Sequence, residues 1–445
     1  MLALLDNTED EGLPEALDLL AAVDEGLVAG FARVDEDRAA ALTDLAGAFA
    51  GSPLADRVTE AVEKIAAGSI ADEHLFALAA ARVAILGAAH DALLVRADAA
   101  LSRTRAAWSG EPGPAATAAN LLAGSRSWLR ELAITGWRGV DHDLVSAAGQ
   151  VIEATLADPE LRRLAVLLDG LAAELRASSP IATLERVPVR RWADLWSRAL
   201  LLAQDGGRAQ RAEGAEPVTG RLLVLGADVH EHGTAVQIQV HGVLEAGGAE
   251  PRLVRASVAA AKVDTIVGPA IWGLFQGQPM LMTALAERRS LDLTDMPLLA
   301  SGDLVWHDDR AKPGAPAEPF ATARVLLTGA LAPAVPPLDR HPARIAEPVF
   351  VEGQSPIPVD TTRLPGCGPL TPEMVTAASA VIGLLRWDAG RWTVQPIAVE
   401  TTVKKKTAAV HTTDWALGPT DSKAAKAAGE AVQVLSERAG RLLRK

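Results

Sequence analysis

Apolar and polar residues follow two different periods along this chain. From residue 13 to about 204, alanine and leucine recur with polar residues at the spacing of an α-helix, and prolines stand at breaks in that pattern. We therefore interpret residues 1–204 as an all-helical domain. Near its end, Trp192 and Trp196 share one helical stripe, which is typical of the face that docks a helix into a core.

A linker and a change of period follow this helical domain. Residues 205–217 combine glycines with charged residues and are interpreted as a linker. Beyond them, Val236, Ile238 and Val240 alternate with polar residues, as in a half-buried strand. We therefore predict a β-rich domain over residues 218–370.

The order of elements within the β-rich domain allows two topologies. The predicted elements are three strands, one helical insertion and two further strands, at residues 221–225, 236–240, 252–258, 264–289, 303–307 and 321–328. This is the element order of an OB-like barrel, a five-stranded Greek key. An antiparallel sheet with one helical insertion has the same order, so both topologies remain open.

Proline becomes frequent after the predicted strands. Residues 311–372 hold 13 of the 27 prolines of the chain. Because proline interrupts helices, the proline-rich segment 311–370 is predicted to be extended or looped, and to wrap over the domains beside it.

The remaining residues, 371–445, are predicted to form a small α/β unit with the order helix, strand, helix. The first helix is expected at 372–385 and is followed by a tight turn at 388–390. The closing helix begins near residue 421 and has an apolar stripe beside lysines and arginines, so it is a basic amphipathic helix. The whole chain is therefore predicted to be a multidomain α+β protein.

The composition is that of a globular protein. The chain has 445 residues, of which 49% are hydrophobic and 22% charged, so it can bury a large core. A single cysteine, Cys367, excludes an intrachain disulfide and a zinc site with several cysteines. Acidic residues occupy the first twelve positions, and charged residues interrupt the apolar stretch 75–95. We therefore expect no export signal and no membrane span, and predict a cytoplasmic protein.

Charge is distributed unevenly between the two ends. Residues 1–60 hold fourteen acidic side chains and three arginines. Their net charge of −11 accounts for most of the net charge of −13 of the whole chain. Residues 400–445 hold nine basic and five acidic side chains. The basic residues that we predict to bind a partner are Lys404, Lys405, Lys406, Arg438, Arg441 and Arg444. Such asymmetry favours docking between the ends or onto a partner, although two solvated faces give the same pattern.

One short motif could bind a metal ion. Asp228, His230 and His232 follow an apolar run, and alternate residues of a strand point to the same face. Two imidazoles on one face can hold a divalent metal, with Asp228 as a third ligand. A hairpin turn at 231–234 with solvated histidines at its tip is the simpler alternative.

The pair His230 and His232 at the end of a strand resembles the first metal-binding strand of the amidohydrolase superfamily. That resemblance implies a TIM barrel in which further residues complete the metal site; His307, His341, His411 and Asp414 are the candidates. The rest of the chain departs from the family. A TIM barrel takes about 250 residues of alternating strand and helix, whereas 213 proline-rich residues follow His232. A metal-dependent hydrolase is therefore kept as an alternative.

Motifs of other large enzyme classes do not occur in the sequence. There is no G-x-S-x-G elbow, phosphate-binding loop, dinucleotide fingerprint or H-E-x-x-H pair. Cys367 stands in a loop with glycines and prolines on both sides that could expose a thiol, but no base can be placed beside it from sequence. The sequence therefore indicates neither a catalytic residue nor an organic cofactor.

Nucleic acid is the other alternative partner, through an OB-like barrel and the basic carboxyl terminus. Single-strand binders combine a cationic groove with aromatic platforms. The candidate strands at 219–258 contain no aromatic residue, and the chain is acidic, with a pI near 5.3. The leading prediction is a non-enzymatic cytoplasmic scaffold or adaptor that binds an unidentified protein partner.

Overall fold

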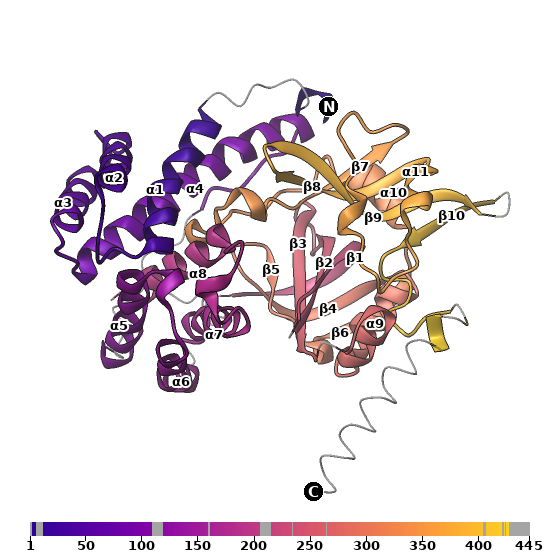
Figure 1. The fold of residues 1–445 in the computed structure, drawn as a ribbon. Helices are drawn as coiled ribbons and strands as arrows, with labels where there is room; N and C mark the ends of the chain where they lie inside the picture. The colour runs from indigo at the N-terminus through magenta and orange to yellow at the C-terminus, as the bar shows by residue number, and fades with distance from the viewer. Residues whose placement is uncertain are drawn as a thin grey trace, which may run out of the picture.

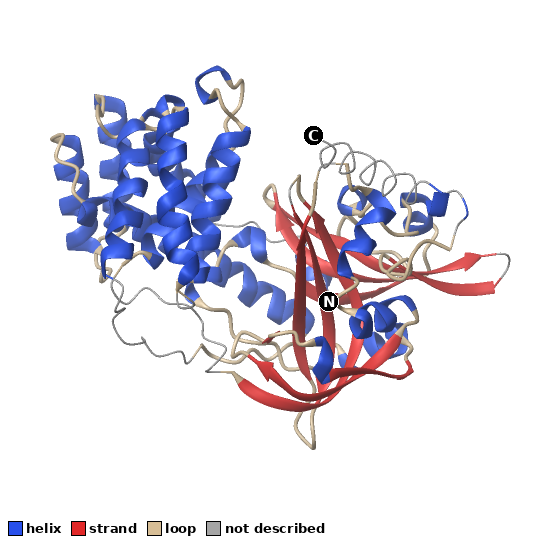
Figure 2. Ribbon diagram, turned by 90° about the horizontal axis from the view of Figure 1, so that it is seen from below, coloured by secondary structure: helices blue, strands red, loops and turns tan. Residues whose placement is uncertain are grey.

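The computed structural model describes residues 2–5, 12–108, 119–158, 161–204, 215–233, 235–263, 265–403, 406–420, 422 and 424–426. Figures 1 and 2 show two halves, with helices on one side and two β-sheets on the other. This arrangement confirms the α+β class and the helical amino-terminal region. The α-helices of that region are α1 (Leu13–Ala29), α2 (Glu36–Ala48), α3 (Ala55–Ala66), α4 (Asp72–Leu101), α5 (Ala119–Thr135), α6 (His142–Ala157), α7 (Arg162–Ala177) and α8 (Val189–Leu202).

Tryptophans fill the centre of the helical region. Trp137, Trp192 and Trp196 are each fully buried. The rings of Trp137 and Trp192 meet edge to face, with centroids 5.9 Å apart. The indole nitrogen of Trp196 donates a hydrogen bond of 2.8 Å to the carbonyl of Leu129. The stripe predicted from the sequence is therefore the docking face of α8, and each ring adds a large apolar area to the core.

Helix α4 joins the two halves. Its first half carries Leu75 and Leu78 into the core of the helical region, and its second half packs Leu93 and Ala97 against the four-stranded sheet. Among the described helices, α4 is long and apolar enough to cross a membrane, but 56% of its most apolar window is buried inside the structure. Such burial is typical of the core helix of a globular protein.

The first sheet is mixed and contains β1 to β6. Strand β1 pairs with β2, β2 with β3, β3 with β5, β5 with β4, and β4 again with β1, so five strands form a circuit, and β6 extends it beside β4. The β3–β5 pair is parallel. The bounds are β1 (Glu216–Glu231), β2 (Ala235–Glu245), β3 (Arg252–Ala261), β4 (Arg289–Leu298), β5 (Asp303–Leu304) and β6 (Ala311–Pro316).

Two strand predictions in this region need correction. Residues 321–328, predicted as a strand, lie mostly in helix α10 (Pro319–Leu326), whose first turn accommodates proline without losing a hydrogen bond. Strand β4 was not predicted, although Leu291 and Leu293 alternate with exposed residues. The helical insertion is confirmed. It consists of η5 (Gly268–Phe275) and α9 (Pro279–Ala286), and Pro279 begins the second helix.

The second sheet is antiparallel, in the order β10-β9-β8-β7. Its strands are β7 (Glu347–Glu352), β8 (Ala380–Asp388), β9 (Arg391–Val403) and β10 (Lys406–His411). The helix predicted at 372–385 is wrong beyond its first turn, because only α11 (Pro372–Thr376) is helical. Strand β8 is buried on both faces, by α4 on one side and the first sheet on the other. Its continuous apolar run therefore shows no alternation.

A bulge in β1 lets this strand serve both sheets. The register shifts between Val224 and Gly226. Val224 before the shift and Ala227 after it both face the core of the first sheet, so the shift changes which alternate residues point inward, and Leu225 faces the second sheet. A side chain at Gly226 would come within 3.1 Å of Ile397, so glycine allows the two sheets to approach closely here.

The middle of the proline-rich segment contacts the helical region. It contains the short 3-10 turns η7 (Pro337–Asp339) and η8 (Pro342–Arg344). One carboxylate oxygen of Asp339 lies 2.9 Å from Arg163 of α7, 3.3 Å from Arg198 of α8 and 2.8 Å from Arg344. The looped backbone predicted from the prolines is confirmed for this stretch, and its ion pairs help to fix the two halves.

Candidate functional site

Asp228, a candidate metal ligand from the sequence, lies between the two sheets. Its side chain is 2% exposed. Its Oδ2 accepts a hydrogen bond of 2.6 Å from Arg386 of β8, and its Oδ1 accepts one of 2.7 Å from Gln395 of β9. Burial by itself would raise the pKa of Asp228, but the hydrogen bond with His230 and the charge of Arg386 hold that pKa well below its ordinary value. Asp228 is therefore a buried carboxylate that joins the sheets.

The two histidines of the motif occupy different settings. Nε2 of His230 lies 2.6 Å from Oδ2 of Asp228, and the His230 side chain is about half exposed. Strand β1 ends at Glu231, so His232 lies in the exposed turn instead of on the strand. The backbone N–H of His232 donates to the carbonyl of Ala235 and closes the hairpin, as the simpler alternative predicted.

The contacts of these residues do not favour metal binding. Both carboxylate oxygens of Asp228 already accept hydrogen bonds, so coordination would have to displace Arg386 or Gln395. Within the described parts of the chain, no three His, Cys, Asp or Glu residues gather in a group that could hold a metal ion. His411, a candidate for completing the site, is buried in the second sheet, where it contacts Phe320.

The basic residues predicted to bind a partner cannot be placed in the same way. Lys404 and Lys405 lie outside the described residues, as do Arg438, Arg441 and Arg444. Lys406 begins β10, but its side chain is not among those described. Their role therefore stays a prediction from charge.

Cys367 is buried, which overturns the expectation of an exposed loop thiol. Its exposure is 0%, and burial raises the pKa of the thiol to about 12. The indole nitrogen of Trp272, in η5, donates a hydrogen bond of 2.9 Å to the Cys367 carbonyl. This bond fixes Trp272 against the loop that follows η9 (Thr361–Arg363).

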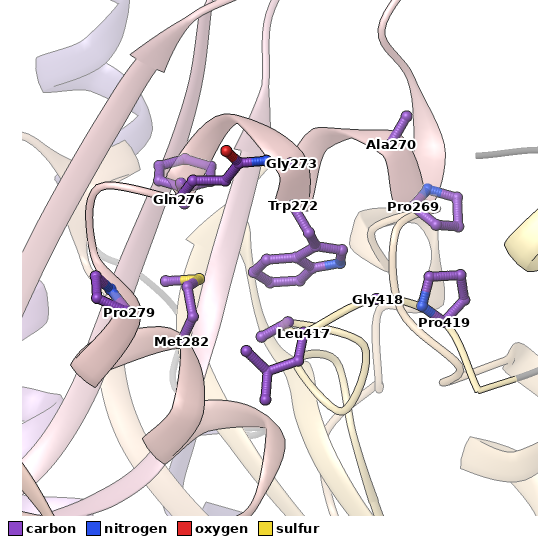
Figure 3. A pocket seen from close by; sticks show the side chains of 12 residues that line it. Pro269, Ala270, Trp272, Gly273, Gln276, Pro279, Met282, Leu417, Gly418 and Pro419 are labelled. Atoms are coloured by element: carbon purple, nitrogen blue, oxygen red, sulfur yellow. The ribbon is translucent and has the colours of Figure 1, made fainter. Parts of the chain in front are cut away.

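Trp272 forms part of an apolar groove of about 470 Å³ in the half of the molecule that holds the two sheets. Figure 3 shows the groove between η5, α9 and the turn at 416–419 that follows β10. Gln276 supplies the single polar side chain of its lining, and the remaining lining residues are apolar or glycine. The residues that shape it most are Pro269, Trp272, Phe275, Met282, Leu417 and Pro419.

Exposed apolar residues lie at and beside this groove. Leu417, in its wall, is 58% exposed, and Val267, which precedes η5, is 55% exposed. Val263, in the loop before η5, is 48% exposed. Large exposed apolar side chains that gather around a concave surface are typical of protein or ligand binding sites.

The walls of the groove are held in place by hydrogen bonds from outside it. The Trp272 indole is bonded to Cys367, and the hydroxyl of Thr412 donates 2.8 Å to the Ala227 carbonyl of β1. Both the η5 wall and the turn after β10 are therefore attached to the body of the molecule. Because these walls are already ordered, they lose little conformational entropy when a partner binds.

Sequence reasoning did not find this groove. The run from 264 to 289 was recognised as apolar and helical, but such a run is equally expected of a buried insertion. The available signal was Leu417, an apolar residue between the turn-forming residues 414 and 418–419.

Comparison with protein-family models, with curated proteins and with solved structures gives no match to this chain. The groove and the network around Asp228 are therefore the evidence on which a function can be argued.

Proposed function

We propose that this protein is a non-enzymatic scaffold or adaptor that acts by binding a protein partner. The observation that carries the proposal is the apolar groove with Leu417 and Val267 exposed at and beside it. An amphipathic segment of a partner would place its apolar side chains in such a groove. Burying the 58% of Leu417 that is exposed would contribute about 1–1.5 kcal/mol to the association.

The attachment between the two halves supports this role. Helix α4 packs in the helical core and against the second sheet, and Asp339 binds arginines of α7 and α8. A partner in the groove would therefore be held at a defined position relative to the acidic helices α1 to α3. Fixed spacing between surfaces is what a scaffold requires.

We further infer that β1 to β5 form an OB-like barrel. The circuit of pairings, the parallel β3–β5 pair and the helical insertion between β3 and β4 support this topology. Barrels of this kind bind nucleic acid on the face of strands 2 and 3. Here the second sheet covers part of that face, packing on Val243 and Leu253.

The uncovered part of that face offers little to nucleic acid. It presents Gln237, Gln239, Ser257 and Ala259, the outward residues of β2 and β3 beyond the second sheet. These side chains provide no aromatic platform and no positive charge, which single-strand binding requires. This supports a protein partner over nucleic acid. The metal-dependent hydrolase is the weaker alternative, because Asp228 is already engaged by Arg386 and Gln395.

The test is affinity purification of the tagged full chain from cells that produce it natively, with bound proteins quantified by mass spectrometry. We expect at least one protein to be recovered in stoichiometric amount and to be lost with Leu417→Asp. The matched control is Val166→Asp, an equally exposed valine on α7 at 65% exposure. If no protein depends on Leu417 while both variants fold as the wild type, the proposal is wrong.

A further inference from the structure

We infer that the groove binds the carboxyl-terminal residues 427–445 of a second copy of this chain. The inference rests on the proposed function, because it names the protein that fills the same groove. The argument combines the position at which the described chain ends, the sequence of the remaining residues and the reach of a helix.

The chain leaves the structure directly beside the groove. Residues 416–419 form one wall, and residues 422 and 424–426 are helical. The 19 residues that follow lie outside the described part of the chain. The sequence therefore continues for 19 residues from a point next to the groove.

The sequence of this segment suits an apolar groove. Val432, Leu435, Ala439 and Leu442 are spaced by three, four and three residues, and basic residues stand between them. A helix with this spacing presents one apolar stripe and keeps its charges on the other faces. This is the pattern by which an amphipathic helix binds a groove, as knobs at i, i+3 and i+7. The lining around Trp272 and Met282 is apolar, as such a stripe requires.

The reach of the helix decides which copy is bound. A helix that continued from Ser422 at 1.5 Å per residue would place Leu435 about 20 Å, and Leu442 about 30 Å, from its start. That start is three residues beyond Pro419 in the groove wall. In such a helix the apolar stripe would lie beyond its own groove and within reach of the groove of another copy.

Reciprocal binding closes the assembly. If each copy inserts its stripe into the groove of the other, both grooves are filled by one two-fold operation, and no unpaired surface remains for further growth. The exposed Leu417 of both copies becomes buried at the same time. The expected assembly is a dimer.

The first experiment measures mass in solution by light scattering after gel filtration, over a series of concentrations. We expect the full chain to be a dimer and a chain ending at Lys426 to be a monomer. Leu435→Asp should raise the dissociation constant of the dimer by about tenfold or more, because it places a charge in the apolar groove. Gln433→Asp, two residues away and on the opposite side of such a helix, is the matched control and should leave the dimer intact.

The second experiment identifies the contact. The single natural thiol, Cys367, is fully buried and does not compete with introduced cysteines. In Leu417→Cys with Leu435→Cys, mild oxidation should give a disulfide between two chains, seen as a doubled mass on a non-reducing gel. Leu417→Cys with Gln433→Cys should link much more slowly, because Gln433 lies on the opposite side of such a helix. A disulfide within one chain would overturn the assignment to a second copy.

The outcomes separate this inference from the proposed function. A full chain that is monomeric at every concentration would overturn the inference. If a protein other than this chain co-purifies with the wild type but not with Leu417→Asp, the proposed function holds although the inference is wrong. If the chain is monomeric and no protein depends on Leu417, both are wrong.

Discussion

Arg386 and Asp228 face each other across the junction of the two sheets, with Nη2 and Oδ2 2.6 Å apart and the side chains 8% and 2% exposed. Gln395 binds both of them: its Nε2 donates a hydrogen bond to Asp228, and its Oε1 accepts one from Arg386. Neither charge could remain buried without the other, because each would lose its hydration without compensation. The pair therefore requires the second sheet to be docked on the first.

Removing Arg386 should destabilise the protein strongly. Arg386→Ala leaves the Asp228 carboxylate buried with one partner fewer, and such a change costs about 3–5 kcal/mol in the free energy of unfolding. Urea denaturation followed by circular dichroism measures the loss. Arg221→Ala is the control, because Arg221 pairs with Glu245 on the surface at 54% exposure and its loss should cost less than about 1 kcal/mol. Equal effects of the two variants would contradict the assignment.

Asp339 should control the attachment of the proline-rich segment to the helices. Asp339→Asn keeps the shape of the side chain but leaves Arg163, Arg198 and Arg344 close together without their shared carboxylate. We expect a loss of about 1–3 kcal/mol and faster tryptic cleavage at Arg344. Asp309→Asn, at an exposed residue, should change neither quantity. Unchanged proteolysis in Asp339→Asn would show that other contacts hold the segment.

Stability should fall with acid before most carboxylates titrate. Burial, together with the positive charge of nearby arginines, lowers the pKa of His241 and of His411 to about 3. In the unfolded chain each histidine binds a proton near pH 6.5, so between about pH 6.5 and 3 the unfolded state binds more protons. The free energy of unfolding therefore decreases as the pH falls, by up to about 1.4 kcal/mol per pH unit for each histidine.

Unfolding measured from pH 6.5 to 5 tests this expectation. His411→Leu should reduce the slope by the contribution of one histidine, since Nε2 of His411 has no hydrogen-bond partner among the described residues to lose. His142→Ala is the control, because the side chain of His142 is 83% exposed. A slope that is the same in His411→Leu and in the wild type would refute the assignment.

Two glycines should respond oppositely to alanine. Gly136 has a φ of 74°, and a side chain there would overlap the backbone of Gly30, where the ends of α1 and α5 meet. Gly136→Ala should therefore cost at least about 2 kcal/mol. Gly149, inside α6, has open space around its Cβ position, and Gly149→Ala should gain up to about 1 kcal/mol. Thermal unfolding of both variants gives the comparison, and a loss in each would contradict it.

Part of the fold follows from local pattern. Val236, Ile238 and Val240 alternate because one face of β2 is buried, and this strand was predicted correctly. Strand β8 was predicted as helix because both of its faces are buried, which removes the alternation on which the prediction depends. Residues 321–328 were predicted as a strand because a short helix beginning with proline, here at 319–326, carries a weak periodic signal.

The candidate site could be predicted less well than the fold. The motif at Asp228 drew attention to chemistry, but the partners of its carboxylate, Arg386 and Gln395, are 158 and 167 residues away in sequence. No spacing rule connects such residues. The motif could therefore be interpreted only as a metal site or as a hairpin turn, whereas the contacts show a carboxylate bound by an arginine and an amide.

The sequence by itself determined the division into a helical and a β-rich part, the hairpin near residue 232 and the unequal charge of the two ends. These features depend on neighbours along the chain, where helical or alternating burial leaves a period in the residue types. The tertiary structure alone decided the packing of the sheets around Asp228 and the groove between η5 and residues 416–419. Both depend on segments that are distant in sequence, and an apolar residue has the same letter whether the fold covers it, as it covers Leu225, or leaves it exposed, as it leaves Leu417.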